Sequence, residues 1–265
     1  MIIDGPLTRA MGLRRSIEAM VMRRCARALV CTGGVAELFR KRYGETGGSK
    51  VSVIPNGYDE ADFQGLSRPA RTSGSPVTFI HAGLLEQVDR DPVPFFRAVA
   101  LALERGRVRR GKLKVDLVGM GNNEVYREEI RRLGLEDTIR LLPPLPYHEA
   151  LAAMAAADIL LLFQGPSCDA QIPAKFYEYL RIGRPILAIT TLAGETGRGV
   201  VTTRSGRVVS WDDPPAMAEA LGEWVENVEN GKPLPACEPA DAVPFSRQNQ
   251  AGVLAERLAT LLNPR

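Results

Sequence analysis

Short apolar runs alternate with helix-like segments from residue 77 to residue 229. Turn residues bound the apolar runs, which read as strands over 77–83, 114–119, 138–142, 158–163, 185–189 and 207–210. The segments between them predict helices over 92–105, 123–133, 147–157, 173–182 and 214–229. Strands that alternate with helices in this way indicate a parallel sheet covered by helices on both faces. We therefore expect an α/β fold with a Rossmann-like parallel sheet.

Composition limits the class of protein. Of the 265 residues, 45% are hydrophobic and 6% aromatic, which is ample for a buried core and favours layered α/β over an all-β sandwich. The net charge of +3 is too small to indicate a nucleic-acid partner. Four cysteines without metal-ligand spacing favour a reducing compartment. With no apolar run of membrane-spanning length and no signal-peptide pattern, we expect a cytoplasmic protein.

The first part of the chain, before residue 77, has its own pattern of expected elements. A helix is expected from Leu13 to about Arg27, followed by a strand over 28–31. Thr32 can cap a second helix, which runs to about Tyr43 and is followed by a loop over 44–48 and a strand over 50–54. Segment 58–76 is rich in Ser, Pro, Gly and Arg and reads as a linker. A last helix is expected over 246–262.

The first expected helix is rich in arginine on one side. Such a helix can pack by its apolar side and leave the arginines in solvent, or it can lie on an anionic membrane surface. The packed arrangement is the simpler interpretation, and peripheral membrane contact is kept as the alternative.

One cation and one carboxylate lie near the start of the helix over 173–182. Lys175 and Glu178 are three residues apart, so we expect them to share its exposed side, while Gly183 suits a left-handed helix end. An anion at the helix start would meet the helix dipole, Lys175 and free backbone N–H groups. The alternative is an ordinary solvated ion pair.

Other candidate residues follow the strands, at the edge where ligands of parallel sheets bind. Gly83 ends the first strand, and Arg90 on the following loop can contact a phosphate. Gly119 and Gly121 form a G-x-G turn, but Glu124 stands where a dinucleotide fingerprint has its third glycine, so that fingerprint fails. Each of these segments can also be an ordinary connecting loop, as can the glycine-rich loop over 191–200.

The loop over 163–175 follows the most apolar strand and holds one acid, Asp169. It also holds Cys168, but neither of the two histidines of the chain, His81 and His148, is placed to activate that thiol. A nucleophilic Cys or Ser mechanism is therefore not expected.

Several motifs together resemble a known family. They include KVSVIPNGYDEADF before the linker, HAGLL with RDP after the first strand of the sheet, LVGMG, and IPAKFYEYLRIGRPILA. In order and spacing over about 17–262, the chain is similar to the C-terminal, donor-binding half of GT-B fold glycosyltransferases of the retaining glycosyltransferase family 4 group.

The resemblance implies a division of the chain. Residues 1–57 would be the end of an incomplete N-terminal, acceptor-side domain, and 58–76 the linker. Residues 77–240 would bind a nucleotide-sugar, and the helix in 241–265 would cross back to the N-terminal domain. Apolar side chains on this last helix and on the first helix would then be partly exposed and could drive association.

The resemblance also implies roles for single residues. Glu178 would hold the ribose hydroxyls, Arg90 and Lys175 would neutralise the diphosphate, and Gly83 would give the leaving group access to the backbone. Leu142 would lie near the base, and the G-x-G turn beside the ligand. Neither a metal nor a cofactor is implied, since the nucleotide-sugar is the substrate.

The sequence departs from the family pattern at two positions. Relatives often carry a first Glu eight residues before the ribose-binding one, where this chain has Ala170. Asp169 is one residue early, which leaves it a weak catalytic candidate. Leu84 stands where many relatives have an Arg.

Three functions remain open on the sequence. The first is a glycosyltransferase that moves a sugar from a UDP or GDP donor to a carbohydrate or lipid-linked acceptor, as in polysaccharide biosynthesis. The second is a nucleotide-sugar-binding module that is inactive without a separate N-terminal chain. The third is an unrelated dinucleotide enzyme, which the failed fingerprint disfavours.

Overall fold

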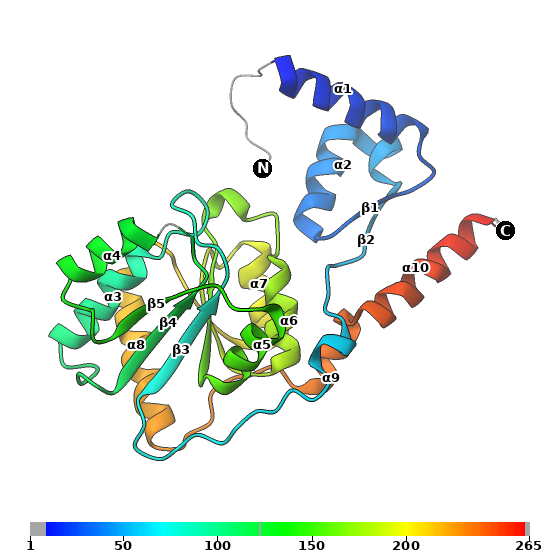
Figure 1. Cartoon of the computed structure of the whole chain (residues 1–265). Helices are drawn as coiled ribbons and strands as arrows, with labels where there is room; N and C mark the ends of the chain where they lie inside the picture. The colour runs from blue at the N-terminus through cyan, green and yellow to red at the C-terminus, as the bar shows by residue number, and fades with distance from the viewer. Residues whose placement is uncertain (1–8, 122, 263–265) are drawn as a thin grey trace.

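The computed structural model describes residues 9–121 and 123–262. Most of them surround one six-stranded parallel sheet (Figure 1). Its strands, in chain order, are β3 (Val77–Ala82), β4 (Leu113–Val118), β5 (Ile139–Leu142), β6 (Ile159–Phe163), β7 (Ile186–Ile189) and β8 (Gly206–Val209). Their spatial order is β5-β4-β3-β6-β7-β8, and every pairing is parallel. The expected α/β fold is thus confirmed, with the strand order of a doubly wound sheet.

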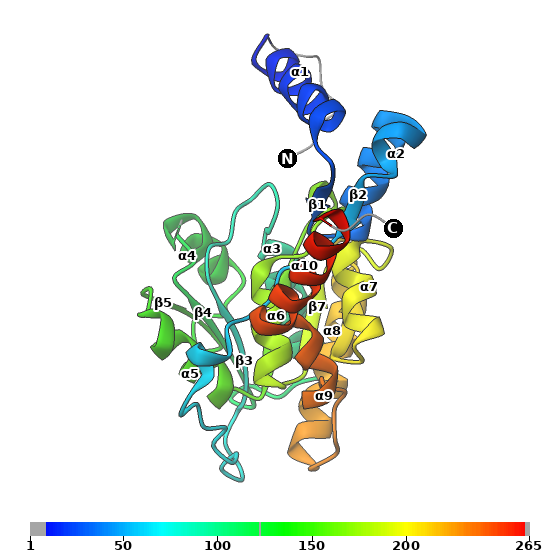
Figure 2. The ribbon, with the colours of Figure 1, turned by 90° about the vertical axis from the view of Figure 1, so that its right-hand side faces the viewer.

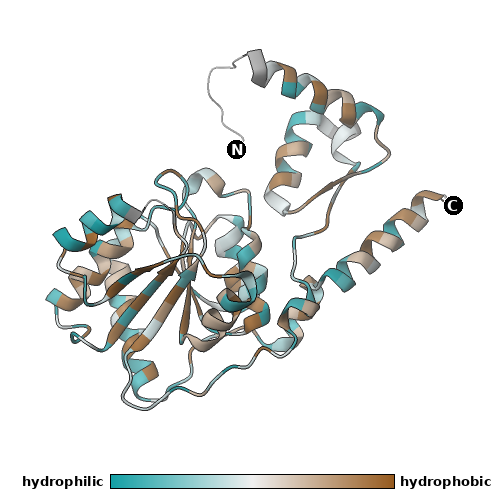
Figure 3. Ribbon diagram, viewed as in Figure 1, coloured by the Kyte–Doolittle hydropathy of each residue, from teal (hydrophilic) through white to brown (hydrophobic). Residues whose placement is uncertain are grey.

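Three helices cover each face of this sheet (Figure 1). The helices α3 (Val93–Glu104), α4 (Asn123–Arg132) and α8 (Pro214–Glu229) pack on one face, and α5 (Tyr147–Ala156), α6 (Ala174–Ile182) and α7 (Glu195–Thr202) on the other. The central strands are apolar toward both layers: in β6 Leu161 joins the first core and Leu160 the second. Figure 3 shows these strands as the most hydrophobic part of the ribbon. A strand buried on both faces has to be a continuous apolar run, which is the pattern that the sequence shows.

A smaller unit precedes the large sheet. It consists of α1 (Arg9–Arg24), β1 (Ala28–Val30), α2 (Gly33–Gly48) and β2 (Val51–Val53). The two strands pair in parallel, and in the described part of the chain neither pairs with a further strand. The Thr32 hydroxyl accepts a hydrogen bond from the Val35 N–H, so the expected helix cap is present.

The first unit also corrects two expectations. The first helix was expected to begin at Leu13, but α1 already begins at Arg9. Residues 44–48, expected to form a loop, continue α2 after a kink at Gly44, whose φ of 61° and ψ of −164° are not helical. The glycine allows this conformation, so the chain bends and then resumes the helix.

The linker segment is more ordered than its composition indicates. A short 3₁₀ turn, η1 (Glu60–Phe63), lies within it, and Tyr58 and Phe63 are buried. The Arg181 guanidinium on α6 pairs with the Glu60 carboxylate and lies 5.2 Å from the centre of the Phe63 ring. An apolar anchor and an ion pair therefore attach the segment to the large unit.

The chain returns to the smaller unit at its C-terminal end. After α9 (Pro239–Ala242) and the turn η3 (Val243–Phe245), α10 (Arg247–Leu262) runs toward β1 and β2 (Figures 1 and 2). The Gln250 side-chain amide donates hydrogen bonds to the Pro55 and Asn56 carbonyls, 2.6 and 2.7 Å away, and the Arg257 guanidinium reaches the Val53 carbonyl at 3.4 Å. The last helix thus contacts the segment around β2, and its assignment as the helix that crosses back to an acceptor-side domain stays a prediction.

Apolar side chains of the outer helices are exposed, as expected. Ile17 and Val21 of α1 are about half exposed, at 48% and 51%, and so is Leu258 of α10 at 50%. None of the helices in 9–121 and 123–262 has the length and hydropathy needed to cross a membrane.

Candidate functional site

A pocket lies where the order of the large sheet reverses, between β3 and β6. The carboxyl ends of these strands diverge there, which is where doubly wound sheets bind ligands. Its volume of about 340 Å³ falls within the range of small-molecule sites. The pocket is lined by His81, Gly83, Leu84, Arg90, Leu162, Phe163, Pro173, Ala174, Lys175 and Glu178. Four of the predicted site residues, Gly83, Arg90, Lys175 and Glu178, therefore meet in one pocket.

Gly83 lets β3 end against the start of α6. Its φ is +137°, a conformation that side chains disfavour, and a Cβ at this position would lie 2.8 Å from the Lys175 Nζ and 3.1 Å from its Cε. The Gly83 N–H remains engaged, since it donates to the Val118 carbonyl at 2.8 Å. The space that a side chain would occupy is thus taken by the lysine.

Lys175 is not on an exposed side, so that expectation is wrong. Its side chain is partly buried, and its ammonium donates a hydrogen bond to the Ala82 carbonyl at the end of β3. Burial lowers the pKa of Lys175, the nearby Arg90 charge lowers it further, and Glu178 raises it. The reason for the error is geometric: the carboxyl end of β3 covers the side of α6 that spacing alone leaves open.

Glu178 is held by a residue that the sequence did not single out. Tyr147, at the start of α5, donates a hydrogen bond from its hydroxyl to the Glu178 Oε1 at 3.0 Å. Burial and the Glu178 charge raise the pKa of Tyr147, so this hydroxyl stays protonated and remains a donor. Tyr147 was used only to mark the start of a helix, because no spacing rule connects it with α6, 31 residues away.

The other predicted residues form the edge of the site, outside the lining of the pocket. The Gly119 N–H donates to the Leu142 carbonyl at 3.0 Å, and a Cβ on Gly119 would meet Pro144. A Cβ on Gly121 would lie 3.3 Å from a methyl group of Leu84, which itself lines the pocket. Gly119 and Gly121 thus let neighbouring loops approach closely, and no contact with a ligand follows from this geometry.

Comparison with known proteins identifies the family. The family model described as "Glycosyl transferases group 1" matches residues 76–227, which is more than half of the chain and includes the whole pocket. The chain belongs to this family.

Curated relatives of this chain include two D-inositol 3-phosphate glycosyltransferases. The protein from Streptomyces scabiei is 25% identical over 251 residues, which cover 90% of this chain and 55% of the relative. The protein from Corynebacterium jeikeium is 28% identical over 215 residues, 77% of this chain and 50% of the relative. The chain thus spans about half the length of these relatives.

Solved glycosyltransferase structures share the fold. The lipopolysaccharide outer core galactosyltransferase WaaB has a TM-score of 0.66 at 14% identity, over 94% of this chain and 66% of WaaB. HepE of Anabaena, solved with UDP-glucose, has a TM-score of 0.65 at 17% identity, over 96% of this chain and 68% of HepE. Because these are GT-B glycosyltransferases, the sheet of this group 1 chain has the GT-B architecture that its motifs indicated.

Asp169, the weak catalytic candidate of this group 1 chain, lies away from the pocket lining. Its Oδ1 is buried, has no hydrogen-bond partner among the described residues, and sits 2.8 Å from where a Cβ of Gly194 would be. Its carbonyl accepts a hydrogen bond from the Glu195 N–H at 2.8 Å. The carboxylate therefore faces the start of α7, and a catalytic role for it stays a prediction.

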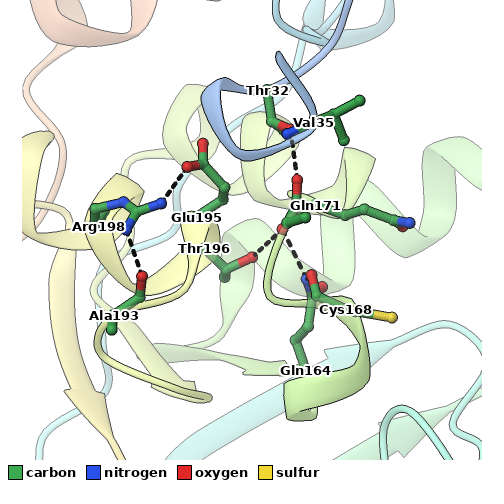
Figure 4. Close-up of polar contacts among 10 residues, drawn as sticks. Thr32, Val35, Gln164, Cys168, Gln171, Ala193, Glu195, Thr196 and Arg198 are labelled. Atoms are coloured by element: carbon green, nitrogen blue, oxygen red, sulfur yellow. Dashed lines mark hydrogen bonds and ion pairs between the residues drawn. The ribbon is translucent and has the colours of Figure 1, made fainter. Parts of the chain in front are cut away.

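The loop that carries Asp169 is tied down on both sides (Figure 4). The Gln164 side-chain amide donates to the Cys168 and Gln171 carbonyls, at 2.9 and 2.8 Å. From the smaller unit, the Thr32 hydroxyl donates to the Ala170 carbonyl at 2.5 Å. The backbone of Ala170 thus joins the two units of the chain.

Proposed function

We propose that this chain is the donor-binding half of a glycosyltransferase. It would move a sugar from a nucleotide-sugar to a carbohydrate or lipid-linked acceptor, without a metal ion and with retention of configuration. The observation that carries the proposal is the convergence of Arg90, Lys175 and Glu178 on one pocket at the reversal point of the sheet.

The charges of this pocket suit a nucleoside diphosphate. Arg90 and the Lys175 ammonium would neutralise the diphosphate, which leaves as an anion when the sugar is transferred. Two cations fixed in a half-buried site can supply the charge stabilisation that a metal ion supplies in other transferases. HepE was solved with UDP-glucose, which supports a donor of this class.

Glu178 would bind the ribose. A carboxylate can accept both hydroxyl protons of a ribose, and the Tyr147 hydroxyl already fixes one carboxylate oxygen. The base would then lie toward the Leu142–Pro143 edge. Relatives named for D-inositol 3-phosphate support a polar, hydroxyl-rich acceptor.

A binding module that lacks turnover on its own is the second candidate. It is favoured because the large unit alone supplies the residues that line the pocket. A partner chain that completes the acceptor side, or self-association, would then be needed for activity. Release of free sugar from UDP-glucose or GDP-mannose by the isolated chain would support the enzyme over the module.

Calorimetry with UDP, GDP and NAD tests the donor site. Glu178→Ala should weaken binding of the preferred nucleoside diphosphate by about 1–3 kcal/mol, or roughly 5- to 150-fold, through lost hydrogen bonds to a charged group. Glu128→Ala, which removes an exposed carboxylate from α4, is the matched control and should bind as the wild type does. Binding of NAD without UDP or GDP would overturn the proposal, and unchanged affinity in Glu178→Ala would refute the ribose role.

A further inference from the structure

His81 is a buried polar group that the roles above leave unused. It is the fifth residue of β3, is 2% exposed, and lines the pocket beside Gly83 and Lys175. Its Nδ1 lies 2.9 Å from the Leu161 carbonyl, whereas its Nε2 is buried and has no hydrogen-bond partner among the described residues. A buried polar atom without a partner is destabilising, so such an atom in a pocket wall calls for an explanation.

The state of the imidazole follows from its surroundings. A carbonyl oxygen can only accept, so the Nδ1 must carry the proton that it donates to Leu161. Burial, with the positive charges of Lys175 and Arg90, lowers the pKa of His81 to about 3. The ring is therefore neutral at physiological pH, and its Nε2 presents a lone pair that can only accept a hydrogen bond.

This lone pair restricts what can occupy the inner end of the pocket. A phosphate oxygen is itself an acceptor and would be repelled by the Nε2, although Arg90 and Lys175 nearby would attract it. The Lys175 ammonium already donates to the Ala82 carbonyl. The ligand group that fits beside His81 must therefore be an uncharged donor, and in a nucleotide-sugar such groups outside the base are the hydroxyls and, in acetamido sugars, the amide N–H.

We propose that the His81 Nε2 accepts a hydrogen bond from a hydroxyl of the sugar that is transferred, and so helps to select that sugar. The proposal rests on the proposed function, which places the ribose at Glu178 and the diphosphate at Arg90 and Lys175. The transferred sugar is then the hydroxyl-bearing part of the donor left for His81.

The substitution His81→Phe tests this role with little damage to the core. A phenyl ring can occupy the site of the imidazole, which already packs edge-on against Phe163 with ring centres 5.4 Å apart. The Leu161 carbonyl would keep a partner, because it also accepts from the Tyr179 hydroxyl at 3.1 Å. His81→Gln is the companion variant, since its amide oxygen restores an acceptor.

Calorimetry with UDP and UDP-glucose, and with GDP and GDP-mannose, measures what the sugar adds to binding. In His81→Phe the nucleotide-sugar should bind roughly 2- to 10-fold more weakly, the loss expected for one hydrogen bond, while the nucleoside diphosphate binds as before. His81→Gln should recover part of the loss. An equal loss for nucleotide and nucleotide-sugar, or no loss for either, overturns the role of His81.

A second readout needs no variant. The chain has two histidines, so the ¹⁵N NMR spectrum of its imidazoles is simple, and the exposed His148 serves as an internal reference. The Nε2 signal of His81 should shift on addition of the nucleotide-sugar and not on addition of the nucleoside diphosphate; the same shift with both would contradict the proposal. A wild-type chain that binds none of these ligands would overturn the proposed function as well, whereas the outcomes above concern His81 alone.

Discussion

Replacing Gly83 by alanine should damage stability and the donor site through a single contact. The Cβ of Gly83→Ala would lie 2.8 Å from the Lys175 Nζ, so the ammonium would have to leave the Ala82 carbonyl. Loss of a hydrogen bond from a charged group costs about 1.5–3 kcal/mol, and the unfavourable backbone conformation at φ +137° adds on the order of 1–3 kcal/mol. Since a displaced ammonium regains some hydration, we expect a net loss of about 3 kcal/mol in the free energy of unfolding.

Urea denaturation measures this loss, and Gly74→Ala is the matched control. Gly74 also has a positive φ, +82°, but a Cβ there would meet nothing within 4 Å, so only a backbone cost of about 1–2 kcal/mol is expected. In a Lys175→Ala background, Gly83→Ala should lose the part of its effect that comes from the lysine. Equal destabilisation by Gly83→Ala and Gly74→Ala, or the same effect of Gly83→Ala in both backgrounds, would refute the reasoning.

Three further predictions concern single side chains. Tyr147→Phe should weaken nucleoside diphosphate binding by roughly 2- to 10-fold and leave inorganic pyrophosphate binding unchanged, since the hydroxyl acts through Glu178. Calorimetry with both ligands measures this, and an equal loss of pyrophosphate binding would contradict the role of the Tyr147 hydroxyl. Because the pKa of His81 is about 3 when folded and ordinarily 6.5, the unfolded chain binds more protons between these values, and stability falls as pH is lowered. From pH 7 to pH 5 the wild type should lose about 2 kcal/mol more than His81→Phe in urea denaturation, and parallel pH profiles would exclude this account. Ile17→Glu or Leu258→Glu should reduce self-association in light scattering, an outcome that a monodisperse wild-type monomer at high concentration would contradict.

The fold of the large unit could be predicted because its signals are local. Continuous apolar runs such as that of β6 mark strands that are buried on both faces. Gly183, which has a left-handed φ of 67°, ends α6 as predicted. The predicted boundaries of helices and loops were wrong where a local signal was ambiguous. Gly44 reads as the end of a helix, but the chain resumes its helical turns after the kink, and the order around Phe63 depends on an α6 side chain 118 residues away.

The sequence predicted which loops meet at the candidate site, but it did not predict which atoms are in contact there. The strand ends placed Gly83, Arg90 and Glu178 on one edge, and the structure brings them into one pocket. Tyr147 and His81 were not singled out as site residues because their contacts, with Glu178 and with the Leu161 carbonyl, join elements that are distant in the sequence. A histidine in an apolar strand looks like an ordinary core residue until the absence of a partner for its second ring nitrogen is known.

The chain passes between its two units twice, near Tyr58 and near Phe245, and these two segments are joined to each other. They run side by side, since the Tyr58 N–H donates to the Phe245 carbonyl at 3.1 Å and the Arg247 N–H donates to the Tyr58 carbonyl at 2.8 Å. The Gln250 side-chain amide adds hydrogen bonds from α10 to the Pro55 and Asn56 carbonyls. Gly57 has no space for a side chain, since a Cβ would fall 2.0 Å from the Phe245 carbonyl oxygen. Because the two segments that connect the units are hydrogen-bonded to each other, a substitution at Gly57 or Gln250 would loosen both connections at once.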